Sequence, residues 1–253
     1  MNFYIVTLFP EMVMQGLGTS ITGRAVKENK IGLKAVNIRD FTEDKHGRVD
    51  DYTYGGGAGM LLQAQPVYDA CESVLSGILQ EAKKRVVCLT PQGRPFTQSL
   101  AEELAKEDAL VLLCGHYEGI DERFIEECVD EEISIGDFVM TGGEIPAMAV
   151  ADAVCRLVPG VLSDPSCYEN ESHWNGILEA PQYSRPEVWH GRAVPPILLS
   201  GNHAKVDQWR RKMSILRTRQ RRPDLYEKLD LSSKEDQKLL RELEEEQGAP
   251  QYP

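Results

Sequence analysis

The sequence predicts an α/β fold in which a mostly parallel sheet carries helices on both faces. Over residues 1–160, short apolar runs of strand length alternate with longer segments of helical character. Several of these apolar runs end directly in glycine-bearing polar loops, as buried parallel strands commonly do. The composition, 42% hydrophobic and 27% charged, is that of a globular protein able to bury a full core.

The expected elements follow one another in a regular order. Apolar runs predict strands at residues 4–9, 33–38, 85–89, 109–114 and 133–140. Periodic segments between them predict helices at residues 20–29, 66–83, 97–106, 120–128 and 143–157. Pro66 and Thr97 are residue types that begin helices.

The N-terminus has neither a basic leading region nor a cleavage site, so we expect a first strand there and not a signal peptide. No apolar run approaches the length of a membrane span. We therefore expect a cytoplasmic protein.

A change in composition marks an expected domain boundary. Pro159-Gly160 ends the helix that carries Arg156, and residues 163–176 are polar and lack a sustained period. We predict an α/β domain at 1–162, a flexible linker at 163–176 and a mostly helical domain at 177–253. The last domain should hold a basic helix from about residue 203 and an acidic helix at 232–246, with residues 248–253 frayed.

Three strand-to-loop junctions predict one pocket. The strand at 85–89 leads into 90–93, the strand at 109–114 leads into 115–123, and the last strand leads into 141–144. Ligands of parallel α/β sheets bind at the carboxyl ends of strands. Taken singly, residues 90–93 could form an ordinary turn, and the acids at 118–122 could be a solvated helix start.

The glycine-dense segment Gly55-Gly56-Gly57-Ala58-Gly59 matches neither a P-loop nor a dinucleotide fingerprint. Its permissive backbone would serve a ligand loop and a tight turn equally well. The six cysteines show no zinc-ligand spacing, and we interpret those in apolar runs as small buried residues. We assign no metal site.

The charge distribution indicates a polyanionic partner despite a net charge of −12. Residues 203–222 hold eight lysines and arginines against Asp207 alone, a local charge of +7. Such a segment is a footprint for nucleic acid, although charge runs are more often solvated helix faces. We predict that it binds RNA phosphates through Lys205, Arg210, Arg211, Arg217 and Arg219.

Taken together, the motifs resemble those of one family, the bacterial tRNA (guanine-N1)-methyltransferases of the SPOUT class. The resemblance runs almost from end to end. Its motifs are Thr7-Leu8-Phe9-Pro10, the glycine segment 55–59 with Met60, Pro91-Gln92-Gly93, residues 114–123, residues 135–144, Pro159-Gly160-Val161-Leu162, residues 183–188, residues 199–203 and Arg221-Arg222-Pro223.

The resemblance implies a fold and a function. Members of the family methylate N1 of the guanine at tRNA position 37, next to the anticodon, with S-adenosylmethionine as methyl donor. They carry a deep trefoil knot, an exception to the general absence of knots. They are homodimers whose active sites are shared between subunits. Their activity is associated with magnesium, which we expect to arrive with the RNA.

By the same resemblance, the cofactor would be bound by residues of all three loops. These are Thr90, Pro91, Gly115, Tyr117, Glu118, Ile135, Gly136, Asp137, Phe138, Val139, Met140, Gly142 and Gly143. Glu118 would face the amino group of the methionine part. Much of the remaining contact would be made by backbone atoms.

The catalytic pair implied by the resemblance is Arg156, near the guanine O6, and a carboxylate in the linker that removes the N1 proton. The family's base is usually an aspartate before a serine, whereas here Glu171 precedes Ser172. We assign Glu171 as the base, with Glu169 as the alternative. His116 stands where many members have arginine.

Two other functions stay open at this point. A dinucleotide-binding enzyme would share the α/β alternation, but the chain lacks the Gly-x-Gly-x-x-Gly fingerprint with an acid about twenty residues on. A non-catalytic RNA-binding module would bind tRNA without transferring a methyl group.

Overall fold

The computed structural model describes residues 1–57, 59–164 and 166–248. It divides into two compact units, Met1–Asp164 and Pro165–Pro253. Ala58 of the glycine segment, Pro165 of the expected linker and residues 249–253, which we expected to be frayed, lie outside the described residues. Within the described ranges, no helix combines the length and the apolar character needed to cross a membrane.

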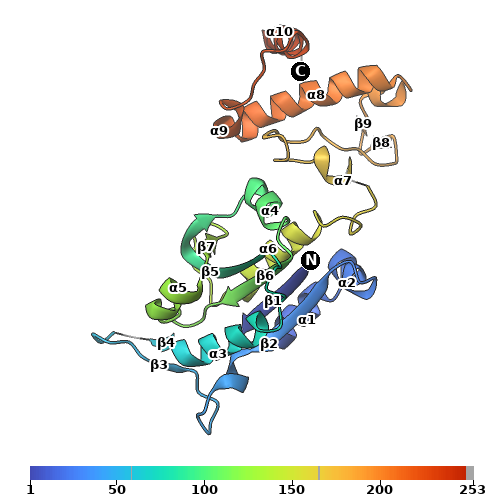
Figure 1. Ribbon diagram of the computed structural model, residues 1–253. Helices are drawn as coiled ribbons and strands as arrows, with labels where there is room; N and C mark the ends of the chain where they lie inside the picture. The colour runs from blue at the N-terminus through green and yellow to red at the C-terminus, as the bar shows by residue number, and fades with distance from the viewer. Residues whose placement is uncertain (58, 165, 249–253) are drawn as a thin grey trace. The chain divides into compact units, whose positions relative to one another are not determined.

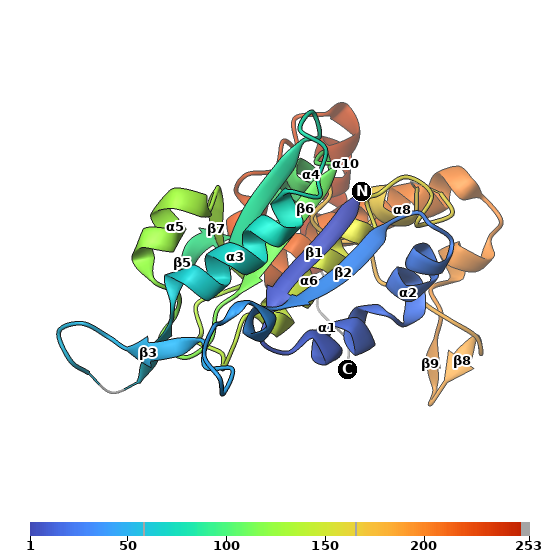
Figure 2. The same cartoon turned by 60° about the horizontal axis from the view of Figure 1, so that its bottom comes forward.

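The first unit is built on a parallel sheet (Figures 1 and 2), as the sequence predicts. In the described part of the chain it has five strands in the order β2-β1-β6-β5-β7, and all neighbours are parallel. The strands are β1 (Asn2–Thr7), β2 (Gly32–Asn37), β5 (Lys84–Pro95), β6 (Ala109–Cys114) and β7 (Glu131–Ser134). Every residue of β6 is buried, which its unbroken apolar run requires.

Alternate residues of each strand point to two separate cores. On β6, Leu110 and Leu112 belong to one apolar cluster, while Val111 and Leu113 belong to the other. Helices α1 (Pro10–Leu17), α2 (Ser20–Lys27), α4 (Gln98–Leu104) and α6 (Glu144–Cys155) bury their apolar faces in the first cluster. Helices α3 (Ala64–Leu75) and α5 (Glu122–Cys128) cover the second face, with the short 3-10 helix η1 (Ile38–Phe41) beside them.

Several boundaries differ from those expected. The predicted strand 133–140 is wrong beyond residue 134, because Gly136 has a φ of 151° and turns the chain out of the sheet. The predicted helix 66–83 ends at Leu75, where Ser76 caps it before Gly77. Helix α1 was not predicted, although Pro10 stands at its first position. Thr97 caps α4 as predicted, accepting a hydrogen bond from the Leu100 amide at 3.3 Å.

The segment 90–93 is an irregularity inside β5 rather than a loop after it. The pairing of β5 with β7 shifts there, so that Leu89 and Arg94 both lie opposite Ile133. Gly93 is required at this point because a Cβ atom would run into the backbone of Glu132 and Ile133. The chain therefore leaves the sheet and returns within four residues.

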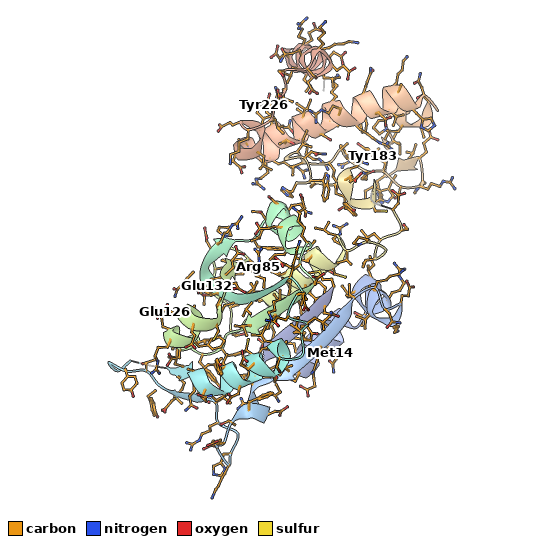
Figure 3. The ribbon with its side chains drawn as sticks, in the orientation of Figure 1. Met14, Arg85, Glu126, Glu132, Tyr183 and Tyr226 are labelled. Carbon is orange, nitrogen blue, oxygen red and sulfur yellow. The ribbon has the colours of Figure 1, made fainter. Side chains whose placement is uncertain are left out.

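A hairpin and an ion-pair cluster complete the first unit. Strands β3 (Asp50–Tyr52) and β4 (Met60–Leu62) are antiparallel and are joined by the glycine-dense turn. Near the other end of the sheet, Arg85 (labelled in Figure 3) donates hydrogen bonds to Glu103, Glu107 and Glu131. These carboxylates raise the pKa of the Arg85 guanidinium, and the cluster ties β5 to α4 and β7.

The second unit is mostly helical and has its own small core. Its main helices are α8 (His203–Arg221) and α10 (Lys234–Gly248), with the short helices α7 (Ser166–Glu169) and α9 (Pro223–Tyr226). The strands β8 (Val188–Trp189) and β9 (Arg192–Ala193) form a short hairpin, and η2 (Pro196–Leu199) is a 3-10 turn. Ile215 of α8 and Leu239 and Leu243 of α10 are buried against one another.

Candidate functional site

A cavity of about 430 Å³ lies at the carboxyl ends of β6 and β7 and beside the irregular segment within β5. Its wall consists mainly of residues 88–92, 115–120, 132–136 and 138–143. This volume lies within the range typical of small-molecule sites. The three junctions that the sequence singled out therefore meet at one cavity.

Of the thirteen residues predicted to bind the cofactor, the cavity collects all but one. It is lined by Thr90, Pro91, Gly115, Tyr117, Glu118, Ile135, Gly136, Phe138, Val139, Met140, Gly142 and Gly143. Asp137 is exposed and does not line the cavity. The role of these residues in cofactor binding stays a prediction.

The loop after β6 is held by the β3–β4 hairpin. The Glu118 amide donates to the Met60 carbonyl at 2.9 Å, and the Leu62 amide donates to the Gly119 carbonyl at 3.0 Å. Gly59 is packed so tightly here that a Cβ atom would meet the Glu118 side chain. Of the glycine-dense segment, Gly59 thus packs against Glu118 in the wall of the cavity, whereas Gly55 and Gly56 face open space.

The loop after β7 follows an irregular path. The Ser134 hydroxyl donates to the Gly136 carbonyl at 3.0 Å and accepts from the Gly136 amide at 3.2 Å, which closes a tight turn. Phe138 and Val139 beyond it are 55% and 83% exposed. Apolar side chains at the rim of a cavity favour contact with a further surface.

The loops after β6 and β7 touch through glycine. The Gly143 amide donates to the Gly115 carbonyl at 2.9 Å, and His116 pairs with Gly142 in an isolated antiparallel bridge. A Cβ atom on Gly143 would lie 2.6 Å from the Cα atom of Cys114. Only glycine lets the two backbones approach this closely.

Sequence reasoning missed a buried polar group behind this contact. Glu144, the first residue of α6, is only 3% exposed, and its carboxylate accepts a hydrogen bond from the Thr7 hydroxyl at 2.6 Å. Its other oxygen lies 2.8 Å from Nε2 of His116. An acid in the first turn of a helix is usually solvated, so the sequence carries no signal that this one is buried.

The two predicted catalytic residues belong to different units. Arg156 caps the C-terminus of α6 and is half-buried. Glu171 is half-buried just beyond α7, and its amide donates to the Tyr168 carbonyl at 3.1 Å. Glu169, the alternative base, is exposed at the end of α7. Both roles stay predictions.

The residues predicted to bind RNA phosphates differ in their surroundings. Arg211 donates two hydrogen bonds to Asp236 of α10, at 2.8 and 3.0 Å. Arg210 is more exposed, and the partner that the described residues show for it is Asp207, three residues before it, at 3.3 Å. The ion pair of Arg211 therefore joins α8 to α10, whereas Arg210 pairs with an exposed acid of its own helix, and surface pairs of that kind contribute little to stability.

The other three predicted RNA contacts also lie on α8. Lys205 is exposed in the first turn. Arg217 donates to the Glu179 carbonyl at 3.4 Å, and Arg219 is half-buried with a buried Nη2 atom to which none of the described residues offers a hydrogen bond. Lys212, part of the same basic segment, is buried and lies 3.3 Å from Glu242 of α10. One side of the helix is thus matched by acids of α10.

Among the described residues, no three His, Cys, Asp or Glu side chains gather closely enough to hold a metal ion. Burial raises the pKa of the Cys88 thiol to about 12 and raises that of Cys114 as well. Both cysteines lie in strands of the core, as expected for small apolar residues.

Comparison with known proteins gives the family. The family model described as tRNA (Guanine-1)-methyltransferase TrmD matches residues 1–228, which include every loop of the cavity. A tRNA (guanine-N(1)-)-methyltransferase of Ruminiclostridium cellulolyticum is 54% identical over 229 residues, 90% of this chain and 97% of the relative. Its namesake from Dehalococcoides mccartyi is 51% identical over 98% of this chain and 99% of the relative. The chain belongs to the tRNA (guanine-1)-methyltransferase family.

Proposed function

We infer that the protein is a methyltransferase that transfers a methyl group from S-adenosylmethionine to N1 of guanosine at tRNA position 37. The observation that carries this inference is the family match over residues 1–228, which spans the three-loop cavity. An NAD-dependent enzyme is not favoured, because the matched family is a methyltransferase family.

The lining of the cavity suits the methyl donor. Apolar side chains of Leu89, Ile133 and Ile135 can enclose an aromatic base, and the glycines at 115, 142 and 143 leave backbone groups within reach of polar atoms. The carboxylate of Glu118 would face the amino group of the methionine part. The donor supplies a methyl group on a positively charged sulfur, which leaves as a neutral thioether.

In the proposed reaction, Glu171 removes the proton from guanine N1. Arg156 stabilises the negative charge that grows on O6 as that proton leaves. An in-line displacement depends on alignment, so the chain contributes mainly position, a base and one positive charge. A loop base such as that at position 37 costs less to unstack than a base inside a duplex.

The finer architecture is also a proposal. We expect the segments around the cavity to form a trefoil knot and the enzyme to work as a homodimer with an active site shared between subunits. The second unit, with its basic helix α8, would bind the tRNA, and residues 163–176 would act as a flexible linker.

The exposed Phe138 and Val139 at the rim support a partner surface near the cavity. A cytoplasmic location follows from tRNA as substrate. We propose that any magnesium arrives with the RNA.

The deciding experiment measures the modified base itself. The protein is incubated with radiolabelled S-adenosylmethionine and a tRNA transcript that has guanine at position 37, and the digested RNA is analysed for 1-methylguanosine. We expect label in that nucleoside, and none from a control transcript with adenine at the same position. Binding of tRNA without methyl transfer would favour the non-catalytic alternative and contradict the proposed function.

A further inference from the structure

Glu144 is an acid that the fold buries almost completely. It stands at the first position of α6 and is 3% exposed. A buried carboxylate is costly unless hydrogen bonds replace the lost water. Acids at helix starts normally avoid this cost by staying in solvent near the positive end of the helix dipole. The burial of Glu144 therefore needs a structural reason beyond capping the helix.

Its two oxygens join three elements. Oε1 accepts from the hydroxyl of Thr7, the last residue of β1, at 2.6 Å, and Oε2 lies 2.8 Å from Nε2 of His116 in the loop after β6. The Thr7 hydroxyl is itself fixed, because it also accepts from the Phe9 amide at 2.9 Å. Thr7 is fully buried and His116 largely so.

This network lies directly behind the wall of the cavity. His116, Gly142 and Gly143 line the cavity, whereas Thr7 and Glu144 do not. A Cβ atom on Gly142 would meet the His116 ring and would lie 2.6 Å from Oε2 of Glu144. The two loops also share the His116–Gly142 bridge. A change in the Glu144 carboxylate would thus shift His116 and Gly142, which line the cavity.

We propose that Glu144 is a positioning residue for the methyl-donor cavity. Its carboxylate accepts from Thr7 and His116 together and thereby fixes the loops 115–117 and 141–143 in their binding geometry. This proposal rests on the proposed function, because it takes S-adenosylmethionine as the ligand of the cavity. It assigns no contact with the ligand to Glu144 itself.

The chemistry of the amide makes Glu144→Gln a sharp test. Glutamine removes the negative charge and offers only one acceptor oxygen, so after accepting from Thr7 it faces His116 with an amide N–H, which only the other imidazole tautomer can accept. The charge-assisted bond between Glu144 and His116 is then lost or replaced by a weaker neutral one, and we expect S-adenosylmethionine to bind about tenfold more weakly. Thr7→Val removes the hydroxyl donor with little change in shape and should act in the same direction.

The experiment compares ligand affinity with stability in each full-length variant. Isothermal titration gives the Kd for S-adenosylmethionine, and thermal unfolding gives the Tm. The matched control is Glu107→Gln, because Glu107 is also a largely buried, ion-paired acid, bound to Arg85 at 2.8 Å, and is not among the residues that line the cavity. We expect the control to lower the Tm without changing the Kd.

Variants of His116 provide a second test of the same contact. His116→Ala should weaken S-adenosylmethionine binding as Glu144→Gln does, and the double variant should lose less than the sum of both, since the two residues act through one contact. His116→Arg keeps a donor for Glu144 and should restore most of the affinity. A group with a purely structural role would show neither this rescue nor this non-additivity.

The outcomes separate the two proposals. In one outcome the wild-type protein binds S-adenosylmethionine, and Glu144→Gln, Thr7→Val and His116→Ala bind it equally well. This result would overturn the positioning role and leave the proposed function intact. Wild-type protein that does not bind the donor would overturn both. Should Glu144→Gln fail to fold, the Kd of Thr7→Val decides the question, because Thr7, unlike His116, does not line the cavity.

Discussion

Gly143 shows how a single residue shapes the candidate site. It caps the N-terminus of α6 without a side chain, and its amide donates to the Gly115 carbonyl at 2.9 Å. Its φ of −82° is one that any residue can adopt, so the need for glycine comes from space alone. The backbone of Cys114 and Gly115 fills the place that a Cβ atom would take.

Gly143→Ala should therefore damage both stability and donor binding. The new Cβ atom would lie 2.6 Å from a backbone atom that cannot rotate away, so the two loops must separate. Overpacking of this kind costs about 1–3 kcal/mol. We expect a lower Tm and weaker binding of S-adenosylmethionine, measured by thermal unfolding and titration. Gly77→Ala is the control, since its nearest atom would be 3.4 Å away and the site is remote from the cavity lining.

Glu171→Gln tests the proposed base. The amide keeps the size of the side chain but cannot accept the N1 proton, so single-turnover methyl transfer should slow by about a hundredfold or more. The Kd for S-adenosylmethionine should not change. Glu169→Gln serves as the matched control, because it is a neighbouring acid of the same segment. If Glu169→Gln slows the reaction and Glu171→Gln does not, the base is Glu169.

Arg156→Ala tests the proposed stabilisation of O6. Loss of a positive charge that acts mainly in the transition state should lower kcat by roughly a hundredfold or more, with little change in donor affinity. Rapid-quench measurement of methyl transfer, together with donor titration, separates these effects. An unchanged rate would show that Arg156 has no part in the chemistry.

At the scale of elements, the contact between α8 and α10 combines an apolar core with ion pairs. Ile215, Leu239 and Leu243 form the buried part, and Arg211 and Lys212 pair with acids of α10 at its side. The Arg211 guanidinium holds the pKa of Asp236 below its ordinary value of 3.8. A carboxylate with a lowered pKa adds stability above its unfolded pKa and loses it as the pH falls through the folded value.

Asp236→Asn should therefore destabilise the second unit in a pH-dependent way. At neutral pH we expect a loss of about 2 kcal/mol, the range for hydrogen bonds to charged groups. As the pH falls through the lowered pKa of Asp236, the wild-type carboxylate itself becomes protonated, so the difference should shrink. Urea unfolding of both proteins over a pH series from neutral to acid checks this. A difference that stays constant or grows on acidification would contradict the assigned ion pair.

At the scale of the whole molecule, positive charge is concentrated in a chain that is acidic overall. The net charge is −12, yet eight lysines and arginines fall within residues 203–222. Among the described residues these cations fall into two kinds: Arg211 and Lys212 pair with acids of α10, while Arg210 pairs with the surface acid Asp207. RNA binding should depend on cations such as Arg210 that do not pair with acids of α10.

Arg210→Gln should weaken tRNA binding and reduce the salt dependence of the binding constant by about one phosphate contact. Filter binding across a series of salt concentrations gives the slope. Arg211→Gln is the matched comparison on the same helix, and we expect it to affect the unfolding free energy more than the salt slope. Equal losses of slope in the two variants would show that the ion pair with Asp236 does not hold Arg211 back from RNA.

Local patterns in the sequence predicted much of the fold of the first unit and the position of its cavity. The unbroken apolar run of β6 and the alternating elements around it predicted a parallel α/β sheet, because burial and strand pairing are written into local periodicity. The glycine-bearing ends of three strands predicted a common cavity, and twelve of the thirteen residues expected there line it. The resemblance to the family, now shown by the match over residues 1–228, came from motifs spread along the chain.

Only the tertiary structure decided what lies behind that cavity. Thr7 and Glu144 are 137 positions apart, and no local pattern distinguishes a buried acid in a first helical turn from a solvated one. The same holds for Arg211 and Arg210, adjacent in sequence but different in their partners, since a helix turns neighbouring side chains toward different surroundings. Periodicity fixes which residues are helical or buried, whereas the pairing of polar groups depends on which distant segments the folded chain brings into contact.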